Sequence, residues 1–215
     1  MDILLENEDF IIINKPHSVS CHNDTNSIEN LFQKRDGKKV HFVNRLDKET
    51  SGLMMLTYKG QRQEDLTQAL KMGLKKYIAV LRGTLPLTEK NSPITWNSPL
   101  TDKAESRLNP QGKTQERIPA LTTVRILKNS SYFSMAECLI ETGRQHQIRK
   151  HAAIAGHSIL CDPRYGNPKD NERIQKIYGL NRLALHAWKL EFTWKNQIYQ
   201  PEAFLPKEFE YLFAH

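Results

Sequence analysis

Short blocks of hydrophobic and polar positions alternate along this chain, and their spacing predicts several strands. Residues 10–13 form an apolar, β-branched run that predicts a strand followed by a loop. Residues 76–82 place apolar side chains on both faces of an extended chain, which indicates a strand inside a sheet. Residues 118–127 and 132–141 predict an antiparallel hairpin, and the alternation over 189–194 predicts a late, half-exposed strand.

Two helices are predicted from a spacing of three to four residues between apolar positions. Residues 63–72 form the first, and we expect Gly73 to end it in the left-handed conformation. The second is predicted to begin with a capping box of Thr142 and Gln145 and to end at Gly156. Strands in hairpins with scattered helices, without regular βαβ alternation, indicate an α+β fold with a mixed, mainly antiparallel central sheet and flanking helices.

Three polar segments are predicted to lack regular structure. Residues 34–39 read as a basic turn, residues 162–166 as a second turn, and residues 101–117 as a long excursion that is either mobile or in contact with a ligand. Neither an internal repeat nor a linker rich in Pro and Ser divides the chain. We therefore predict a single domain over residues 1–215.

Composition narrows the class of protein. Of the 215 residues 39% are hydrophobic, which excludes full disorder, and the longest apolar run is far shorter than the roughly 20 residues of a membrane-spanning helix. The acidic N-terminus lacks the features of a secretory signal. The three cysteines fit neither a disulfide framework nor a C-x-x-C metal site. These features predict a cytoplasmic protein without a membrane partner.

The charge is concentrated in the middle of the chain. The formal net charge is +7, but residues 1–31 and 191–215 carry −5 and −2. Residues 32–190 therefore carry +14, from 28 basic and 14 acidic side chains. Such a stretch favours a polyanionic partner such as a nucleic acid, although an ordinary solvated surface would also account for it.

Two segments concentrate residues that could carry chemistry. Asp47 lies between Arg45 and Lys48, before a Thr-Ser-Gly turn, and neighbouring cations keep such a carboxylate ionised for work as a nucleophile or base. It could equally stabilise only its own turn. Residues 141–151 open the second predicted helix with basic and polar side chains that suit a phosphate, or that simply form an exposed basic face. Its two histidines are five residues apart, which argues against a zinc site.

Four segments together resemble the RNA pseudouridine synthases of the ribosomal large-subunit type. Residues 45–53 (RLDKETSGL) resemble the signature R-L-D-x-x-T-S-G-L of these enzymes, and residues 76–79 resemble K-x-Y-x-A. Residues 142–149 (TGRQHQIR) and 182–187 (RLALHA) resemble T-G-R-x-H-Q-I-R and R-L-x-L-H-A. The chain departs from the common pattern at Asn44 and Cys161, where His and Gly are frequent.

The resemblance implies that a uridine within RNA is isomerised to pseudouridine by base flipping, without metal or cofactor. Asp47 would be the nucleophile, Tyr77 would pack under the target base, and Arg149 would pair with the aspartate. Arg45 would fill the space that the flipped base leaves. The other residues that would bind RNA or the base are Lys15, Thr50, Arg144, His146 and Gln147.

The resemblance further implies a transfer or ribosomal RNA as the partner, and we take the enzyme to be a monomer. We expect no separate N-terminal RNA-binding domain, so residues 34–39 and 101–117 are candidates for target selection. Two other functions stay open. One is a non-catalytic RNA-binding or RNA-chaperone protein on the same fold, and the other is a carboxylate-based glycosidase that would release uracil.

Overall fold

The computed structural model describes residues 1–22, 24–87 and 92–214, and the chain packs into two compact units. The first unit consists of Met1–Lys75 and His186–Phe204, and the second of Lys76–Leu185 and Leu205–His215. The chain therefore passes between the units within β5 (Leu74–Arg82), at the start of β9 (Leu185–Trp194) and after Phe204. The single domain predicted from the sequence stays a prediction.

The first unit is built on a mixed sheet. Besides β9, its strands are β1 (Asp2–Glu6), β2 (Ile11–Lys15), β3 (His41–Phe42), β4 (Ser51–Thr57) and β10 (Gln197–Tyr199). The order is β1-β2-β4-β9, with β3 on β4 and β10 on β9. The described pairs are antiparallel apart from β4 and β9, where Ser51 lies opposite His186 and Gly52 opposite Ala187 in parallel register.

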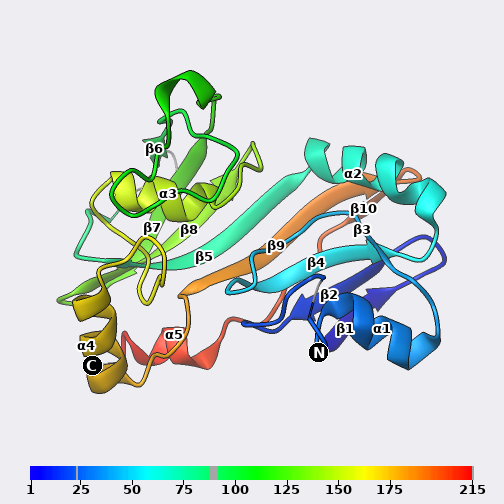
Figure 1. The fold of residues 1–215 in the computed structure, drawn as a ribbon, viewed down its shortest axis with the longest axis horizontal. Helices are drawn as coiled ribbons and strands as arrows, with labels where there is room; N and C mark the ends of the chain where they lie inside the picture. Colours follow the sequence, from blue (N-terminus) through cyan, green and yellow to red (C-terminus); the bar gives the residue numbers. More distant parts are fainter. Residues whose placement is uncertain (23, 88–91, 215) are drawn as a thin grey trace. The chain divides into compact units, whose positions relative to one another are not determined.

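Two helices lie on opposite sides of these strands, α1 (Ile28–Asp36) beside β2 and α2 (Gln63–Met72) on the other side (Figure 1). A short 3-10 helix, η1 (Gly60–Arg62), leads into α2. Leu66 and Leu70 of α2 pack in one core cluster with alternate residues of the strands, among them Phe10, Ile12 and Leu53. Because successive strand residues point to opposite faces, this packing fixes which face of the sheet α2 covers.

Two local expectations in this unit are wrong. The predicted basic turn at 34–39 begins inside α1, which Ser27 caps by accepting the Asn30 N–H and which ends at Gly37 with φ +64°. Helix 63–72 is confirmed, but Gly73 is extended, with φ −92° and ψ −172°. A Cβ at Gly73 would meet the carbonyl of Glu191, so close packing against another strand, rather than a left-handed turn, requires glycine there.

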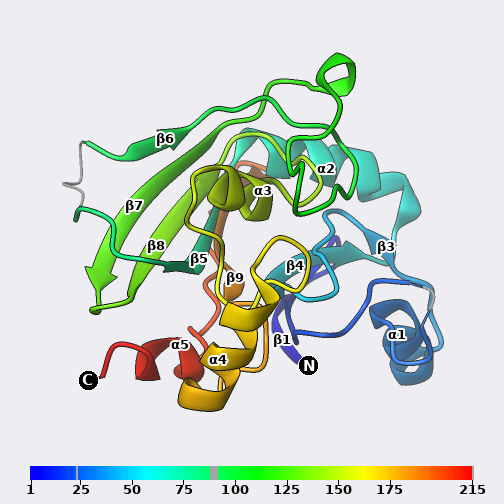
Figure 2. The same cartoon turned by 60° about the vertical axis from the view of Figure 1, so that its left-hand side comes forward.

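The second unit holds the predicted hairpin. The strand order is β5-β8-β7-β6, in which Thr122 of β7 lies opposite Ile140 of β8 in an antiparallel pair. The elements are β6 (Ile94–Trp96), β7 (Thr122–Asn129), β8 (Phe133–Ile140), η2 (Thr114–Glu116), α3 (Gln147–Ile154), α4 (Pro168–Tyr178) and α5 (Lys207–Tyr211). Helix α3 packs on β7, and residues 101–117 run beside it (Figure 2).

Mainly antiparallel strands with flanking helices confirm the predicted α+β class. The predicted strands at 10–13, 76–82, 118–127, 132–141 and 189–194 correspond to β2, β5, β7, β8 and the second half of β9, with ends shifted by a few residues. Among the described residues no helix combines the length and the apolar character needed to cross a bilayer.

Candidate active site

Asp47 lies in the first unit on a loop between β3 and β4 that is fastened to β4. The Asn44 side chain accepts the Met55 N–H at 2.7 Å, which holds the entry of the loop against the strand. The carbonyl of Asp47 accepts the Thr50 N–H at 3.1 Å, which closes a turn just before β4 begins. The side chain of Asp47 is half-buried, while those of Arg45 and Lys48 are exposed. A carboxylate is thereby placed on a short, fixed turn with cations on either side.

Lys15 supports the same loop from β2. Its side chain is fully buried, and its ammonium donates to the carbonyls of Pro16 and Val19 at 2.9 Å and of Lys48 at 3.2 Å. A buried charge is stabilised only when its donors are satisfied, and here three backbone carbonyls do so. This burial favours a positioning role for Lys15. The RNA contact predicted from the sequence stays a prediction.

Gly52 allows β4, which follows the loop directly, to approach β9 closely as a parallel neighbour. Its φ is +111°, and a Cβ there would meet the backbone nitrogen, carbon and oxygen of Ala187 on β9. Next to it the Ser51 hydroxyl and the His186 Nδ1 are 2.7 Å apart, both side chains being buried. Ser51 and Gly52 of the Thr-Ser-Gly sequence are therefore the residues at which β9 pairs with β4.

Replacing Gly52 with alanine is expected to destabilise the protein by at least about 2 kcal/mol, because a side chain there meets both a strained φ and the Ala187 backbone. Urea unfolding would measure the loss. Gly37→Ala is the matched control, since Gly37 also has a positive φ but no atom lies within 4 Å of the place that a Cβ would take. Equal losses in the two variants would contradict the close-packing argument.

The hydroxyl of Thr50 is an unusual group in this loop. The side chain is buried, and among the residues that the structure describes it has no hydrogen-bond partner. Leaving a buried hydroxyl unpaired costs about 1–3 kcal/mol, so such groups call for an explanation. A role in binding, as predicted for Thr50, is one that would supply the missing partner.

The second unit contributes a buried guanidinium held by a carboxylate. Arg149 on α3 donates from Nε to Asp162 Oδ2 and from Nη2 to Asp162 Oδ1, both at 2.8 Å, and the two side chains are almost fully buried. Asp162 Oδ1 also accepts the N–H groups of Arg164 and Tyr165 at 2.8 and 3.0 Å. This bidentate pair fixes the plane of the Arg149 guanidinium.

The charge of Asp162 depends on this pairing. Burial alone would raise the pKa of its carboxyl, but the hydrogen bonds and the charge of Arg149, together with the N–H groups of Tyr165 and Arg164, lower the pKa below its usual value. Cys161, directly before it, has φ +54°. The glycine that is common at this position in the resembling enzymes is thus explained by a left-handed backbone.

His146 lies at the start of α3 in a left-handed conformation, with φ +57° and ψ +27°. Its Nδ1 is 3.0 Å from the Tyr165 hydroxyl, which in turn accepts the Glu105 N–H at 3.2 Å. Burial raises the pKa of Tyr165 to about 12, so that hydroxyl keeps its proton at neutral pH. Tyr165 thereby links His146 at the start of α3 to the backbone of Glu105.

Gln147 is occupied within the protein. Its Oε1 accepts from the Thr142 hydroxyl at 2.7 Å and the Arg144 N–H at 3.1 Å, and its Nε2 donates to Leu121 O at 2.8 Å and Thr122 Oγ1 at 3.0 Å. The predicted capping box of Thr142 and Gln145 is wrong, because Thr142 bonds to the side chain of Gln147 and α3 starts there. These contacts favour a structural role for Gln147, and its RNA contact stays a prediction.

The excursion at 101–117 is anchored to the same region. Asp102 Oδ1 accepts the Gln145 N–H at 2.7 Å, and the buried ammonium of Lys150 donates to Thr101 O at 2.8 Å. Arg107 donates to the carbonyl of Gly166 at 3.1 Å. These contacts hold the segment against the α3 region and so argue against the mobile alternative, while contact with a ligand stays a prediction.

The structure thus gathers the predicted residues into two sets. The first unit holds Arg45, Asp47 and Thr50 on the loop before β4, with Lys15 of β2 in contact with that loop. The second unit holds the other five, which are Tyr77, Arg144, His146, Gln147 and Arg149. Tyr77 is half-buried on β5, and Arg144 Nε donates to Pro119 O at 3.3 Å. The pair of Asp47 with Arg149 stays a prediction.

Asp162, Tyr165 and His186 support these sets, and sequence reasoning gave them no role. The only signals for them are the D-P-R-Y-G turn and the R-L-x-L-H-A segment. Within the described residues no three His, Cys, Asp or Glu side chains are grouped to hold a metal ion. What the two sets offer chemically is a carboxylate on a fixed turn, a rigid guanidinium, a phenol and an imidazole.

Comparison with known proteins gives one consistent result. The family model described as RNA pseudouridylate synthase matches residues 9–154. Ribosomal large subunit pseudouridine synthase C of Escherichia coli (strain K12) is 32% identical over 201 residues, which cover 89% of this chain and 61% of that protein. Ribosomal large subunit pseudouridine synthase D of Neisseria meningitidis serogroup B is 33% identical over 210 residues, covering 90% and 54%. The chain thus spans little more than half the length of these relatives.

Solved structures agree on the fold. Human RNA pseudouridylate synthase domain containing 1 superposes with a TM-score of 0.76 at 21% identity, over 95% of this chain and 83% of that one. Human RNA pseudouridylate synthase domain containing 4 superposes with a TM-score of 0.77 at 22% identity, over 97% and 90%.

Proposed function

Because the chain belongs to the RNA pseudouridylate synthase family, we propose that this protein converts a uridine within RNA to pseudouridine, with Asp47 as the catalytic nucleophile. The N-glycosidic bond between N1 and the ribose breaks, the base turns, and uracil C5 bonds to the ribose. The hydrogen on C5 leaves as a proton and N1 takes up a proton, so the product is an isomer of uridine. The reaction involves no change of oxidation state and needs no cofactor. The observation that carries the proposal is Asp47 on its fastened turn, inside the matched segment.

Asp47 acts as an ionised carboxylate, either by attack on the ribose or the base or by assisting elimination to a glycal. Both routes need the carboxylate in a fixed direction, because orientation contributes a large part of the rate enhancement when two groups must meet. The Asn44 amide and the buried Lys15 ammonium supply that fixation through the backbone of the loop. Lys15 is therefore a positioning residue in this proposal.

Residues of the second unit complete the proposed machinery. Arg149 pairs with Asp47 and keeps it charged, and Asp162 holds the guanidinium in the required plane. Tyr77 packs under the target base. The exposed Arg45 takes the space that the extruded base leaves, and Thr50, Arg144 and His146 contact the RNA. Gln147 keeps the segment 142–147 in place.

The substrate is a structured RNA from which the uridine is flipped out of its stack, which costs a few kcal/mol. Contacts between RNA phosphates and the basic side chains within residues 32–190 offset this cost. Loops are the favoured context, since their bases are less stacked than those of a duplex. The names of the relatives make ribosomal RNA the first substrate to test and transfer RNA the second. The enzyme works as a monomer in the cytoplasm.

Pseudouridine mapping tests the proposal. Carbodiimide mapping of ribosomal and transfer RNA is expected to lose at least one site when the gene is deleted, and the purified protein is expected to restore that site in the unmodified RNA. If every site survives deletion and the protein modifies neither RNA, the proposal fails. Release of free uracil would instead indicate a glycosidase, and rescue of the deletion by an inactive variant would indicate a non-catalytic RNA-binding protein.

A further inference from the structure

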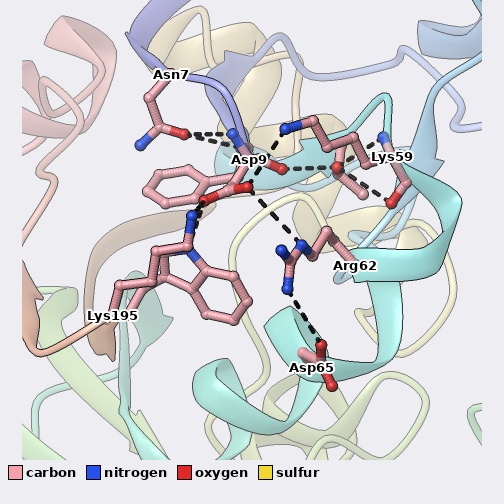
Figure 3. A network of polar contacts seen from close by, with 9 residues as sticks. Asn7, Asp9, Lys59, Arg62, Asp65 and Lys195 are labelled. Atoms are coloured by element: carbon pink, nitrogen blue, oxygen red, sulfur yellow. Dashed lines mark hydrogen bonds and ion pairs between the residues drawn. The ribbon is translucent and has the colours of Figure 1, made fainter.

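Three cations surround one buried carboxylate in the first unit (Figure 3). The side chain of Asp9, which precedes β2, is 7% exposed and accepts the Trp194 Nε1–H at 3.0 Å. Lys195 Nζ lies 2.5 Å from Asp9 Oδ2, while Lys59 Nζ and Arg62 Nε lie 3.6 and 3.9 Å from Oδ1. None of the motifs that identify the family includes these residues.

The cluster carries a surplus of positive charge. Hydrogen bonds from Lys195 and Trp194 hold the pKa of Asp9 at about 2, so its carboxylate is ionised at neutral pH. One negative charge therefore faces three positive ones. Asp65 lies 3.9 Å from Arg62 Nη1, but its side chain is 63% exposed and is screened by water. Even with Asp65 counted, the cluster is positive.

The side chains of Lys59 and Arg62 make ion pairs with Asp9 without using their N–H groups in hydrogen bonds to it. The distances from Lys59 and Arg62 to Asp9 exceed the 2.7–3.2 Å of an N–H···O bond, so charge alone holds them there. Elsewhere in the described part of the chain neither side chain has an acceptor within hydrogen-bond distance. Both are 41% exposed, and Lys195 is 57% exposed. An ammonium and a guanidinium held side by side with unused donors match the oxygens of a phosphate.

We propose that Lys59, Arg62 and Lys195 form a binding site for backbone phosphates of RNA, separate from the Asp47 loop. The proposal rests on the proposed function, which supplies the polyanion. Asp9 serves as the anchor of the site: it keeps the three cations together against their mutual repulsion while using few of their donors. Lys195 lies within residues 191–215, whose net charge is −2, so the distribution of charge along the sequence did not indicate a phosphate site there.

The position of the site indicates which part of the RNA it would hold. Asp47 precedes β4 (Ser51–Thr57), and Lys59 follows it, so the two lie beyond opposite ends of one strand. A strand rises about 3.3 Å per residue, which separates them by roughly 20 Å. Stacked nucleotides rise about 3.4 Å each, so the phosphates held here would lie on the order of six nucleotides from the target uridine.

Binding of labelled RNA to the full chain tests the proposal. Lys59→Gln/Arg62→Gln is compared with Lys71→Gln/Lys189→Gln, which removes the same charge at the far end of α2 and on β9. For a single-stranded RNA of about 20 nucleotides, fluorescence anisotropy is expected to show about tenfold weaker binding for the first variant. Its salt dependence should be shallower by roughly 0.7 in slope for each lost phosphate contact. An RNA of about five nucleotides centred on uridine should not distinguish the variants.

Several results would overturn the proposal. Equal losses in the two variants would indicate general charge attraction, and no loss in either would leave the cluster a purely structural one. Lys59→Arg/Arg62→Lys keeps both charges and both kinds of donor, so it should bind the 20-nucleotide RNA within about twofold of the parent, and a tenfold loss in it would contradict a site made by these charges. Loss of poly-glutamate binding without loss of RNA binding would assign an acidic protein instead. RNA binding that follows the expected pattern, without any pseudouridine formed, would refute the proposed function and leave this site standing.

Discussion

Replacing Asp47 with asparagine is expected to lower the rate of pseudouridine formation by a factor on the order of 10⁴ or more, while RNA affinity changes by less than about fivefold. The amide has nearly the shape of the carboxylate but is a much weaker nucleophile and has no charge to pair with Arg149. The turn should persist, because it is made by the Asp47 carbonyl and the Thr50 N–H rather than by the side chain.

Single-turnover release of tritium from RNA labelled at uracil C5 would measure this rate directly, since that hydrogen leaves when the new bond forms. Glu49→Gln is the matched control, because it removes one carboxylate charge from the same loop two residues away. We expect it to keep the rate within about tenfold. Turnover by Asp47→Asn close to that of the parent would refute the role of Asp47.

Replacing Asp162 with asparagine is expected to lower the free energy of unfolding by about 3–5 kcal/mol, because it removes the buried carboxylate to which both Nε and Nη2 of the buried Arg149 guanidinium donate. Total stabilities are about 5–15 kcal/mol, so a large share is lost. Urea unfolding at neutral pH would measure it. Glu116→Gln serves as the control, since its ion pair with Lys103 is exposed and screened by water, so that the free energy of unfolding is expected to change little.

Unfolding at low pH and a double substitution both test the ion pair of Arg149 with Asp162. The pKa of Asp162 is lowered in the folded state, so its contribution is complete above the unfolded pKa of about 3.9 and is lost as the pH falls through the folded value. Asp162→Asn should therefore lose less stability than the parent as the pH falls below about 4. Arg149→Met/Asp162→Asn should be more stable than Asp162→Asn alone, because the buried guanidinium that Asp162 neutralises is then gone as well. Additive losses would contradict this account.

The sequence predicted those helices and strands whose own residues show the apolar spacing typical of a helix or a strand. Helix α2 and the hairpin of β7 and β8 have apolar positions at the period of their structure, and both are confirmed. Helix α4 was not predicted although Asn167 caps it, Pro168 begins it and Gly179 ends it with φ +68°. It buries no residue, and its apolar positions, Ile174, Ile177 and Tyr178, are confined to its C-terminal half, so they do not form a stripe along the whole helix.

The sequence motifs predicted where the candidate site lies, but they did not predict which residues are buried supports and which are exposed. Lys15 and Gln147 look like surface groups in the sequence, yet both are buried and hydrogen-bonded to segments elsewhere in the chain. Asp162 looks like part of a turn, and only the fold shows that it holds Arg149. Burial and partners of this kind depend on packing between distant segments, which local spacing does not encode.

The passage of the chain between the units has a consequence for how the protein is made. The parallel contact of Gly52 with Ala187 joins positions 135 residues apart, and the first unit receives its strand β9 only after residues 76–185 of the second unit have been synthesised. Until then the edge of β4 lacks its neighbour. Because closure of such distant contacts is slow, we expect the N-terminal residues to wait on the ribosome as an incomplete, aggregation-prone sheet that is completed late in translation.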